Sequence, residues 1–258
     1  MYFYIYDSFL REKKYERDLA IIETRLTDLG ISGKIGRLTP FTNARGLIRD
    51  EARRGVQTVV VVGNDETVAK VIDGIGEEKI TLGILPVGSP TYIANSLGIP
   101  EGPDACDELS KRITQKIDLG RINGRFFLSD VRIPRGRVII EGEGKYRIST
   151  LVQDCEVIVS NLRSQAMATM IFTDTSQPGD PKDGWLDALI TPRPSFGDMF
   201  RKKGSAVCSV FPLRKMNISS EEPIAVVADG REFSGNNLCI EVVPDRLKII
   251  TGRERAFA

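Results

Sequence analysis

The sequence contains no histidine in its 258 residues. This absence excludes every histidine-based catalytic triad, a histidine general base and most zinc hydrolase sites. Any proton transfer must therefore fall to Asp, Glu, Lys, Tyr or Cys. The cysteines form no Cys-x-x-Cys pair, which indicates reduced core residues rather than a metal or disulfide set. They stand at wide spacing, at Cys106, Cys155, Cys208 and Cys239.

The chain also lacks an apolar run of the roughly 18 to 20 residues that a membrane-spanning helix requires. Its first residues, MYFYIYDSFLREKK, show neither a basic start nor a small-residue cleavage site, so we expect a cytoplasmic protein. The formal net charge of +1 does not indicate a nucleic-acid partner. The length permits two domains or one large one, with a proper core.

Residues 55–75 have the pattern of half a parallel α/β unit. Residues 56–62 form a largely β-branched run, which predicts a strand buried on both faces, and a Gly-Asn-Asp turn follows it. Helix-spaced apolar residues come next, at Val68, Val71, Ile72 and Ile75. The helix amino terminus would face the end of the strand, which favours an anion such as phosphate. The alternative is a simple helix cap formed by Asp65 or Thr67.

A second strand–loop–helix unit follows in residues 80–97. A short strand is expected over residues 80–85, and Ser89 and Pro90 predict a helix start over residues 91–97. Both loops would lie at one edge of a parallel sheet, where a ligand cleft is expected. The remaining pattern predicts strands over residues 1–6 and 34–38, and helices over residues 15–29, from Thr42 or Asn43 to Gly55, and over residues 104–116.

After Lys116 the pattern changes to short alternating strands separated by turn signals such as Asn123-Gly124 and Asp229-Gly230. An antiparallel β-sandwich explains this pattern best. We therefore expect an α/β domain over residues 1–116 and a β-sandwich domain over residues 117–258, with the last residues packing back on the first domain.

Five segments carry a resemblance to a known family. Residues 82–100, LGILPVGSPTYIANSLGIP, are similar to LGIIPLGTGNDFARSLGIP, and residues 42–67 are similar to a helix–strand segment that ends in GGDGT. Residues 117–127, 181–187 and 227–231 are similar to iDlg.vng..F, P.DG.LD and v.DGE. The chain therefore resembles the diacylglycerol kinase catalytic-domain family, which shares its fold with the NAD kinases.

This resemblance implies ATP- and Mg²⁺-dependent phosphorylation of a lipid or lipid-like hydroxyl. Phosphoryl transfer needs backbone donors and cations around the phosphates, and a carboxylate near the nucleophile. The resemblance implies that Asp229 is the base that activates the acceptor hydroxyl. It assigns the nucleotide to two loops, at Gly63, Asn64, Asp65, Glu66, Thr67, Gly88, Ser89 and Thr91.

Four segments depart from the family pattern. Residues 63–67 are GNDET instead of GGDGT, residues 88–92 are GSPTY instead of GTGND, residues 229–231 are DGR instead of DGE, and residues 6–9 are YDSF instead of NP.sG. An added carboxylate at the phosphate turn repels a triphosphate unless Mg²⁺ or a lysine intervenes. The second hypothesis is therefore a catalytically inactive kinase-fold protein that binds a nucleotide, a lipid or a partner. An NAD kinase-like enzyme is the third, although that group also needs the GGDGT loop.

Other charged positions have two interpretations each. Asp183 and Asp187 fit either a turn or a metal site, and Asp229 also fits a hairpin turn because Asp-Gly is a strong turn signal. The basic residues 201–203 fit a solvated face or a peripheral contact with an anionic membrane. Exposed strand edges in such sandwiches often pair between chains, so we expect a homodimer.

Overall fold

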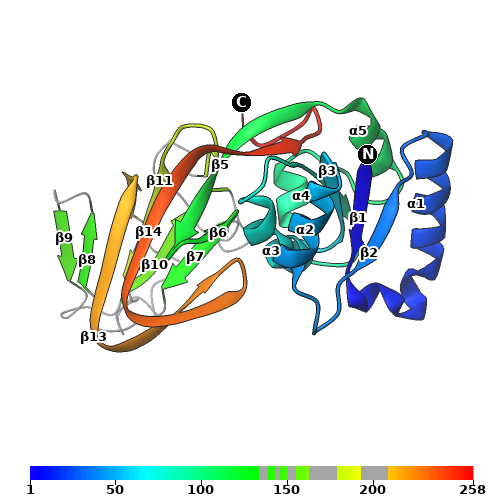
Figure 1. Ribbon diagram of the computed structural model, residues 1–258. Helices are drawn as coiled ribbons and strands as arrows, with labels where there is room; N and C mark the ends of the chain where they lie inside the picture. The colour runs from blue at the N-terminus through cyan, green and yellow to red at the C-terminus, as the bar shows by residue number, and fades with distance from the viewer. Residues whose placement is uncertain (134–138, 143–145, 150–154, 163–178, 193–208, 258) are drawn as a thin grey trace, which may run out of the picture. The chain divides into compact units, whose positions relative to one another are not determined.

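The computed structural model describes residues 1–133, 139–142, 146–149, 155–162, 179–192 and 209–257. The chain folds into two compact units (Figure 1). Unit 1 comprises Met1–Ile117 and Asp245–Ala258, and unit 2 comprises Asp118–Pro244. Two long strands, β5 (Thr114–Ile122) and β14 (Arg231–Ile250), continue from one unit into the other.

Unit 1 is built on a parallel sheet. Its strands pair in the order β2-β1-β3-β4, and the last residues of β14 pair in parallel with β4. Strand β3 is buried along its whole length, as its β-branched run predicts. The four strands are β1 (Tyr2–Tyr6), β2 (Lys34–Arg37), β3 (Thr58–Gly63) and β4 (Thr81–Pro86).

Helices cover both faces of this sheet, with α2 and α3 on one face and α1 and α5 on the other (Figure 1). The apolar residues predicted for the inner stripe of α3 are all buried, because the 3.6-residue period directs them towards the sheet. The helices are α1 (Glu16–Asp28), α2 (Ala44–Arg53), α3 (Asp65–Ile75), α4 (Tyr92–Ser96) and α5 (Asp104–Lys111), and 3-10 turns η1 (Ser8–Arg11) and η2 (Lys13–Tyr15) follow β1.

Two predicted helix boundaries are wrong. The helix predicted over residues 104–116 ends at Lys111, because Arg112 has a left-handed backbone (φ 53°) and β5 begins at Thr114. Ser89 does not cap the next helix along the loop, since Thr91 is the N-cap of α4 and the Ser89–Pro90 peptide bond, which is cis, lies before it. Neither boundary is visible in the local pattern of apolar residues.

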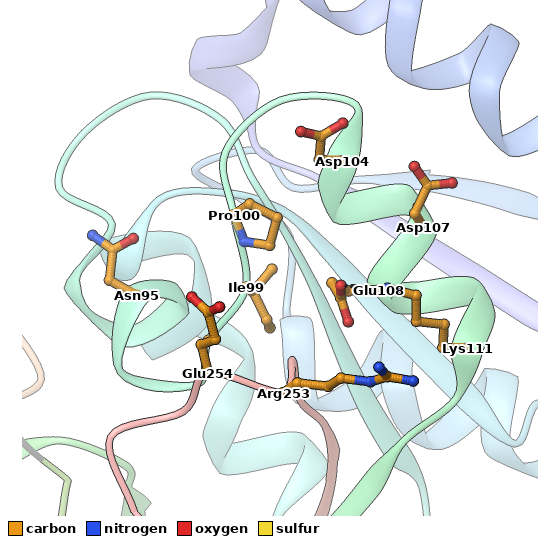
Figure 2. Close-up of a pocket in the computed structure, with 10 residues that line it drawn as sticks. Asn95, Ile99, Pro100, Asp104, Asp107, Glu108, Lys111, Arg253 and Glu254 are labelled. Carbon is orange, nitrogen blue, oxygen red and sulfur yellow. Dashed lines mark hydrogen bonds and ion pairs between the residues drawn. The ribbon is translucent and has the colours of Figure 1, made fainter.

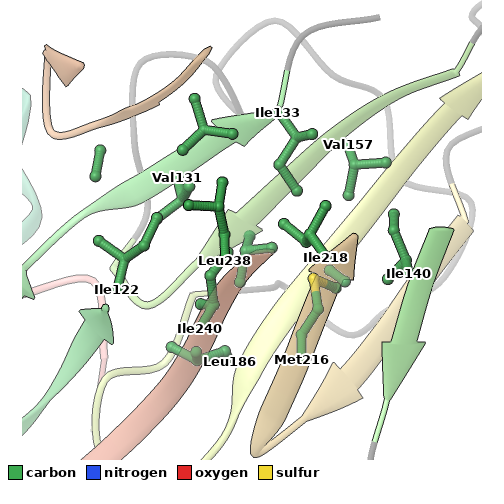
Figure 3. Close-up of a cluster of buried hydrophobic side chains, with 14 of the residues drawn as sticks. Ile122, Val131, Ile133, Ile140, Val157, Leu186, Met216, Ile218, Leu238 and Ile240 are labelled. Carbon is green, nitrogen blue, oxygen red and sulfur yellow. The ribbon is translucent and has the colours of Figure 1, made fainter. Parts of the chain in front are cut away.

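Unit 2 is an antiparallel β structure. Its main path of strands runs β12-β11-β10-β7-β13-β14, and a hydrophobic core lies against these strands (Figure 3). Together with unit 1 this confirms the predicted class, an α/β domain followed by antiparallel β-sheet. The strands are β6 (Arg125–Phe127), β7 (Asp130–Ile133), β8 (Ile139–Gly142), β9 (Tyr146–Ser149), β10 (Cys155–Ser160), β11 (Leu186–Pro192), β12 (Ser209–Leu213) and β13 (Lys215–Ala228).

Two sequence predictions depend on which residues the structure describes: the basic cluster and the lack of a membrane-spanning helix. The basic residues 201–203 lie outside the described range. Within it, every helix is too short or too polar to pass through a lipid bilayer.

Candidate functional site

The strand order of unit 1 marks one position on the sheet as special. Strands β2 and β3 follow β1 in the chain and lie on opposite sides of it, so the strand order reverses at β1. In open parallel sheets, ligands bind outside the carboxyl ends of the strands at such a switch point. Here the ends of β1 and β3 bring Asp7 and the Gly63-Asn64 turn together, and the Asp7 N–H donates to the Val62 carbonyl at 3.4 Å.

The turn after β3 is a capping box. The Thr67 N–H donates to Asn64 Oδ1 at 3.1 Å, and the Asn64 N–H donates to Thr67 Oγ1 at 3.3 Å. A Cβ at Gly63 would lie 2.3 Å from Thr67 Oγ1, so glycine is required there. The helix cap is therefore Asn64, supported by Thr67, and the prediction of Asp65 as the cap of α3 is wrong.

Asp65 instead caps a different helix. Its carboxylate accepts the N–H groups of Tyr92 at 2.8 Å and Ile93 at 3.1 Å, the first turn of α4. Its own N–H donates to the Pro90 carbonyl at 2.9 Å. The Asn64 side-chain amide donates to the Ser89 carbonyl at 3.0 Å. The two predicted ligand loops are therefore hydrogen-bonded directly to each other.

These bonds leave few free donors at the turn. Within the described part of the chain, the Glu66 N–H is the one amide of the first turn of α3 with no hydrogen bond. The Glu66 side chain is exposed. The predicted phosphate turn therefore offers a single backbone donor, so a phosphate group there would need an additional cation.

Such a cation lies at the switch point. The Lys70 ammonium donates to Asp7 Oδ2 at 2.7 Å, and Thr67 Oγ1 donates to the same oxygen at 3.0 Å. Burial opposes ionisation of Asp7, but hydrogen bonds from Lys70, Thr67 and Ser8 outweigh it and hold the pKa of this carboxyl below its usual value. The Asp7 carboxyl is buried, whereas the Lys70 side chain remains 47% exposed, so the ammonium can contact a ligand.

The sequence analysis missed Asp7 and Lys70. One signal was present for each residue. Asp7 directly follows a buried strand, as Asn64 does, and Lys70 lies one helical turn after Thr67 on the same face of α3.

The loop after β4 holds the other predicted nucleotide contacts. Gly88 has a positive φ of +80°, and a Cβ there would lie 2.9 Å from the Phe9 ring, which requires glycine. The Ser89 carbonyl accepts the bond from Asn64. Thr91 is buried and donates through Oγ1 to Glu101 at 2.8 Å. The Thr91 hydroxyl hydrogen is therefore directed to Glu101.

Asp229 lies in unit 2, in the turn between β13 and β14, with a left-handed φ of 46°. Its Oδ2 accepts the Leu128 N–H at 2.6 Å, and its Oδ1 accepts those of Ser129 at 2.8 Å and Asp130 at 3.1 Å. Burial raises the pKa of Asp229 to about 6, and these three hydrogen bonds only partly oppose the shift. A carboxylate has about four acceptor positions, so one remains at Oδ2.

A network of buried polar groups surrounds the same turn in unit 2. The Asn161 amide nitrogen, on the segment after β10, donates to the carbonyls of Asp118 at 3.0 Å and Leu128 at 2.9 Å. Asp118 in turn accepts the Gly184 N–H at 2.8 Å. The sequence analysis did not identify Asn161 or Asp118, because the contacts link segments far apart in the chain.

The predicted metal candidates bind backbone groups instead. Asp183 accepts the Trp185 N–H at 2.8 Å, and Asp187 accepts the Gly179 N–H at 2.7 Å. Burial raises the pKa of both carboxyls, with neighbouring carboxylates adding to the effect. Among the described residues, no group of three or more His, Cys, Asp or Glu side chains could hold a metal ion.

One pocket, of about 590 Å³, lies elsewhere in unit 1 (Figure 2). Asp104, Glu108 and Lys111 line it from α5, and Arg253 and Glu254 line it from the segment after β14. No predicted site residue lines this pocket. The candidate site therefore has two parts, each described within its own unit: the switch point of unit 1 and the Asp229 turn of unit 2.

The fold defines the class: a protein with a parallel α/β unit, whose predicted ligand loops lie at the switch point of its sheet, and an antiparallel β unit. The sequence profile of the diacylglycerol kinase catalytic domain matches residues 3–122. Over these residues the chain is similar to the diacylglycerol kinase catalytic-domain family, the family that its motifs resemble.

Individual relatives agree with this assignment. A diacylglycerol kinase of Bacillus subtilis is 26% identical over 129 residues, which are 48% of this chain and 43% of that protein. A probable lipid kinase, YegS-like, of Pseudomonas aeruginosa is 26% identical over 244 residues, 80% of each chain. The crystal structure of a diacylglycerol kinase from Bacillus anthracis shares the fold, with a TM-score of 0.76 at 19% identity over 98% of this chain and 97% of that one.

Proposed function

We propose that this protein transfers a phosphoryl group from ATP to the hydroxyl of a lipid or lipid-like alcohol. Similarity to the diacylglycerol kinase catalytic domain and to lipid kinases supports this substrate class. The observation that carries the proposal is the partly exposed side chain of Lys70 at the β1/β3 switch point, where its ammonium contacts Asp7. A cation is what the altered phosphate turn needs, because the turn has lost glycines and gained a carboxylate.

In this proposal Lys70 holds the phosphates and Asp7 holds Lys70. The ammonium has three donors and gives one to Asp7, so two remain for phosphate oxygens. ATP supplies the phosphoryl group: the acceptor oxygen forms a bond to the γ-phosphorus as the bond to ADP breaks. Mg²⁺ is expected from the family, but no step is assigned to it because the described side chains form no metal site.

Asp229 is proposed as the acceptor of the hydroxyl proton. A pKa of about 6 leaves it ionised at pH 7 and close to the range that suits a general base. The three backbone bonds hold the carboxylate in one orientation, and the remaining acceptor position at Oδ2 can take the proton. This role comes from the family resemblance, and the hydrogen bonds support it.

The second candidate is a protein of this fold that binds a lipid without phosphoryl transfer. The Asp65 carboxylate favours it. Both of its oxygens accept N–H groups of α4, so a negative charge already occupies the end of that helix. A phosphate that approached the same N–H groups would be repelled.

Calorimetric titration of ATP, with and without Mg²⁺, separates the two candidates. For the first, wild type binds ATP with a dissociation constant in the micromolar range, on the order of 8 kcal/mol. Lys70→Met weakens binding at least tenfold, whereas Lys79→Met, at an exposed site on the same unit, leaves it unchanged. Transfer of labelled phosphate to an alcohol in a lipid extract, lost in Asp229→Asn, completes the test.

A different pattern supports the second candidate. Wild type then binds no ATP, and Asp65→Gly restores binding while Glu66→Gln does not, because Asp65 rather than Glu66 occupies the end of α4. Equal ATP affinity in wild type and Lys70→Met would contradict the role of Lys70 in the first candidate.

A further inference from the structure

The most exposed large hydrophobic side chain among the described residues is Phe41, at 97%. Single exposed apolar residues are common on protein surfaces. Phe41 differs because the backbone around it is held in place. It occupies the third position of a turn over residues 39–42, in the connection between β2 and α2, and this connection projects from the helices and strands of unit 1 (Figure 1).

Hydrogen bonds keep this turn in one conformation. The Thr42 N–H donates to the Thr39 carbonyl at 2.9 Å, the Thr39 N–H donates to Thr42 Oγ1 at 3.0 Å, and the two hydroxyls are 2.7 Å apart. Pro40 restricts the second position of the turn. The phenyl ring of Phe41 is therefore presented to solvent by an ordered turn, and little conformational entropy is lost when it meets a binding surface.

The turn lies at the edge of the sheet that carries the candidate site. Strand β2 pairs in parallel with β1, with Arg37 opposite Tyr6, and the Leu38 N–H donates to the Tyr6 carbonyl at 2.8 Å. Asp7 follows Tyr6 directly. Phe41 thus projects from the carboxyl edge of the parallel sheet, the edge at which Asp7 and Lys70 lie.

The charge around Phe41 favours one kind of surface. Residues 29–49 contain four basic residues and no Asp or Glu. Three of the four, Lys34, Arg45 and Arg49, are paired with carboxylates of Glu51, Glu77 and Glu78. Arg37, which is exposed at the end of β2, lies over the Tyr6 ring and has no carboxylate partner in the part of the chain that the structure describes.

We propose that Phe41 inserts into the surface of an anionic lipid membrane. The apolar ring would enter the interface, and the exposed guanidinium of Arg37, close to it in the sequence, would meet the anionic lipid headgroups. The inference rests on the proposed lipid substrate, since membrane contact at this edge brings the switch point to the layer in which a lipid hydroxyl lies. It assigns the contact to the turn between β2 and α2 rather than to the basic residues 201–203.

Co-sedimentation of the full chain with vesicles tests the proposal, with phosphatidylglycerol and phosphatidylcholine as separate arms. Phe41→Ala is expected to weaken binding to phosphatidylglycerol vesicles about tenfold, as for the loss of one buried aromatic ring. Ile21→Ala removes an exposed apolar residue from α1, at 42% exposure, and is expected to leave binding unchanged. Urea unfolding midpoints should be the same for wild type and Phe41→Ala, because the ring packs against nothing.

Fluorescence provides an independent readout. In Phe41→Trp, added vesicles should shift the emission to shorter wavelength, and bromine-labelled lipids should quench it. Wild type, whose single tryptophan is Trp185, is the control. Binding of Phe41→Ala as tight as wild type, or no blue shift in Phe41→Trp, overturns the proposal.

Two outcomes separate this inference from the proposed function. Vesicle binding that depends on Phe41 in a protein without phosphoryl transfer supports the membrane contact and contradicts the kinase proposal. If Phe41→Ala instead lowers ATP affinity with unchanged vesicle binding, the ring contacts the nucleotide base and the membrane proposal is wrong.

Discussion

Two aspartates of the predicted site, Asp65 of a nucleotide loop and Asp229 as the predicted base, accept backbone N–H groups of other segments. Asp65 accepts two from the start of α4, and Asp229 accepts three from residues 128–130. Each carboxylate thereby holds a backbone segment that is distant from it in the sequence. The sequence motifs predicted a functional role for both positions. They could not predict the partners, because the bonded groups lie 27 and about 100 residues away in the sequence.

The raised pKa of Asp229 predicts a pH dependence of stability. The native state keeps the proton to about pH 6, whereas the unfolded chain loses it near pH 4. Stability therefore falls as the pH rises from about 4 to about 6 and is level above. Asn tolerates the left-handed backbone at this position, so Asp229→Asn removes the titration without adding strain.

Urea unfolding of wild type and Asp229→Asn at pH 4 and pH 7 measures this effect. The stability of wild type relative to the variant should fall by about 2 kcal/mol between the two pH values, from the relation between pKa and free energy. Asp7, whose pKa is lowered, also contributes to the pH dependence of stability. Its contribution is the same in both proteins and cancels in the difference between them. A difference that is the same at both pH values would show that folding does not raise the pKa of Asp229.

At the scale of elements, α4 is held from two sides. Asp65 caps its first turn, and the segment after β14 crosses its end. The Gly252 N–H donates to the Leu97 carbonyl at 2.9 Å and the Ala256 N–H to the Ser96 carbonyl at 2.8 Å. The backbones are so close that a Cβ at Gly252 would lie 1.7 Å from the Gly98 carbonyl oxygen. This short helix is therefore stabilised by tertiary contacts rather than by its own propensity.

Gly252→Ala should therefore destabilise unit 1 by more than about 2 kcal/mol, because the clash is with backbone that cannot move aside easily. Gly46→Ala is the matched control. Gly46 lies in α2, and a Cβ there would be 3.5 Å from its nearest neighbour, so alanine should be neutral or stabilise by up to about 1 kcal/mol. Chemical denaturation of both variants gives the comparison, and equal midpoints would mean that the crossing is looser than the structure indicates.

At the scale of the whole molecule, unit 1 contains both ends of the chain. Residues 245–258 belong to it although more than a hundred residues of unit 2 come before them. Lys248 and Ile249 of β14 pair with Thr81 and Leu82 of β4. The β-sheet of unit 1 is thus complete only after the chain has passed through unit 2, which makes its folding depend on contacts of long sequence separation.

Ile249→Ala is expected to destabilise unit 1 by about 2 to 5 kcal/mol, the usual cost of removing a fully buried aliphatic side chain. Ile249 is 0% exposed, whereas its neighbour Lys248 points to solvent. Lys248→Ala should change stability by less than about 0.5 kcal/mol. Protease digestion in native buffer should cut the Ile249 variant within residues 1–117 first. Preferential cleavage in unit 2 would contradict the assignment of this segment.

The local sequence determined much of unit 1 and the class of the whole chain. Strand β3 and the inner stripe of α3 follow from a β-branched run and a 3.6-residue period, which are local signals. The motif at residues 82–100 and its neighbours predicted a resemblance to the diacylglycerol kinase catalytic domain, and the comparison over residues 3–122 confirms this resemblance. Histidine-based chemistry was excluded by composition alone.

The tertiary structure decided which polar groups meet. Lys70 reaches Asp7, Asp65 caps α4 instead of α3, and Arg112 ends α5 five residues before its predicted last residue. Each outcome depends on parts of the chain that the apolar pattern does not connect. Apolar periodicity reports which face of an element is buried, whereas a hydrogen bond depends on positions to within a few tenths of an ångström. Only the assembled fold determines those positions.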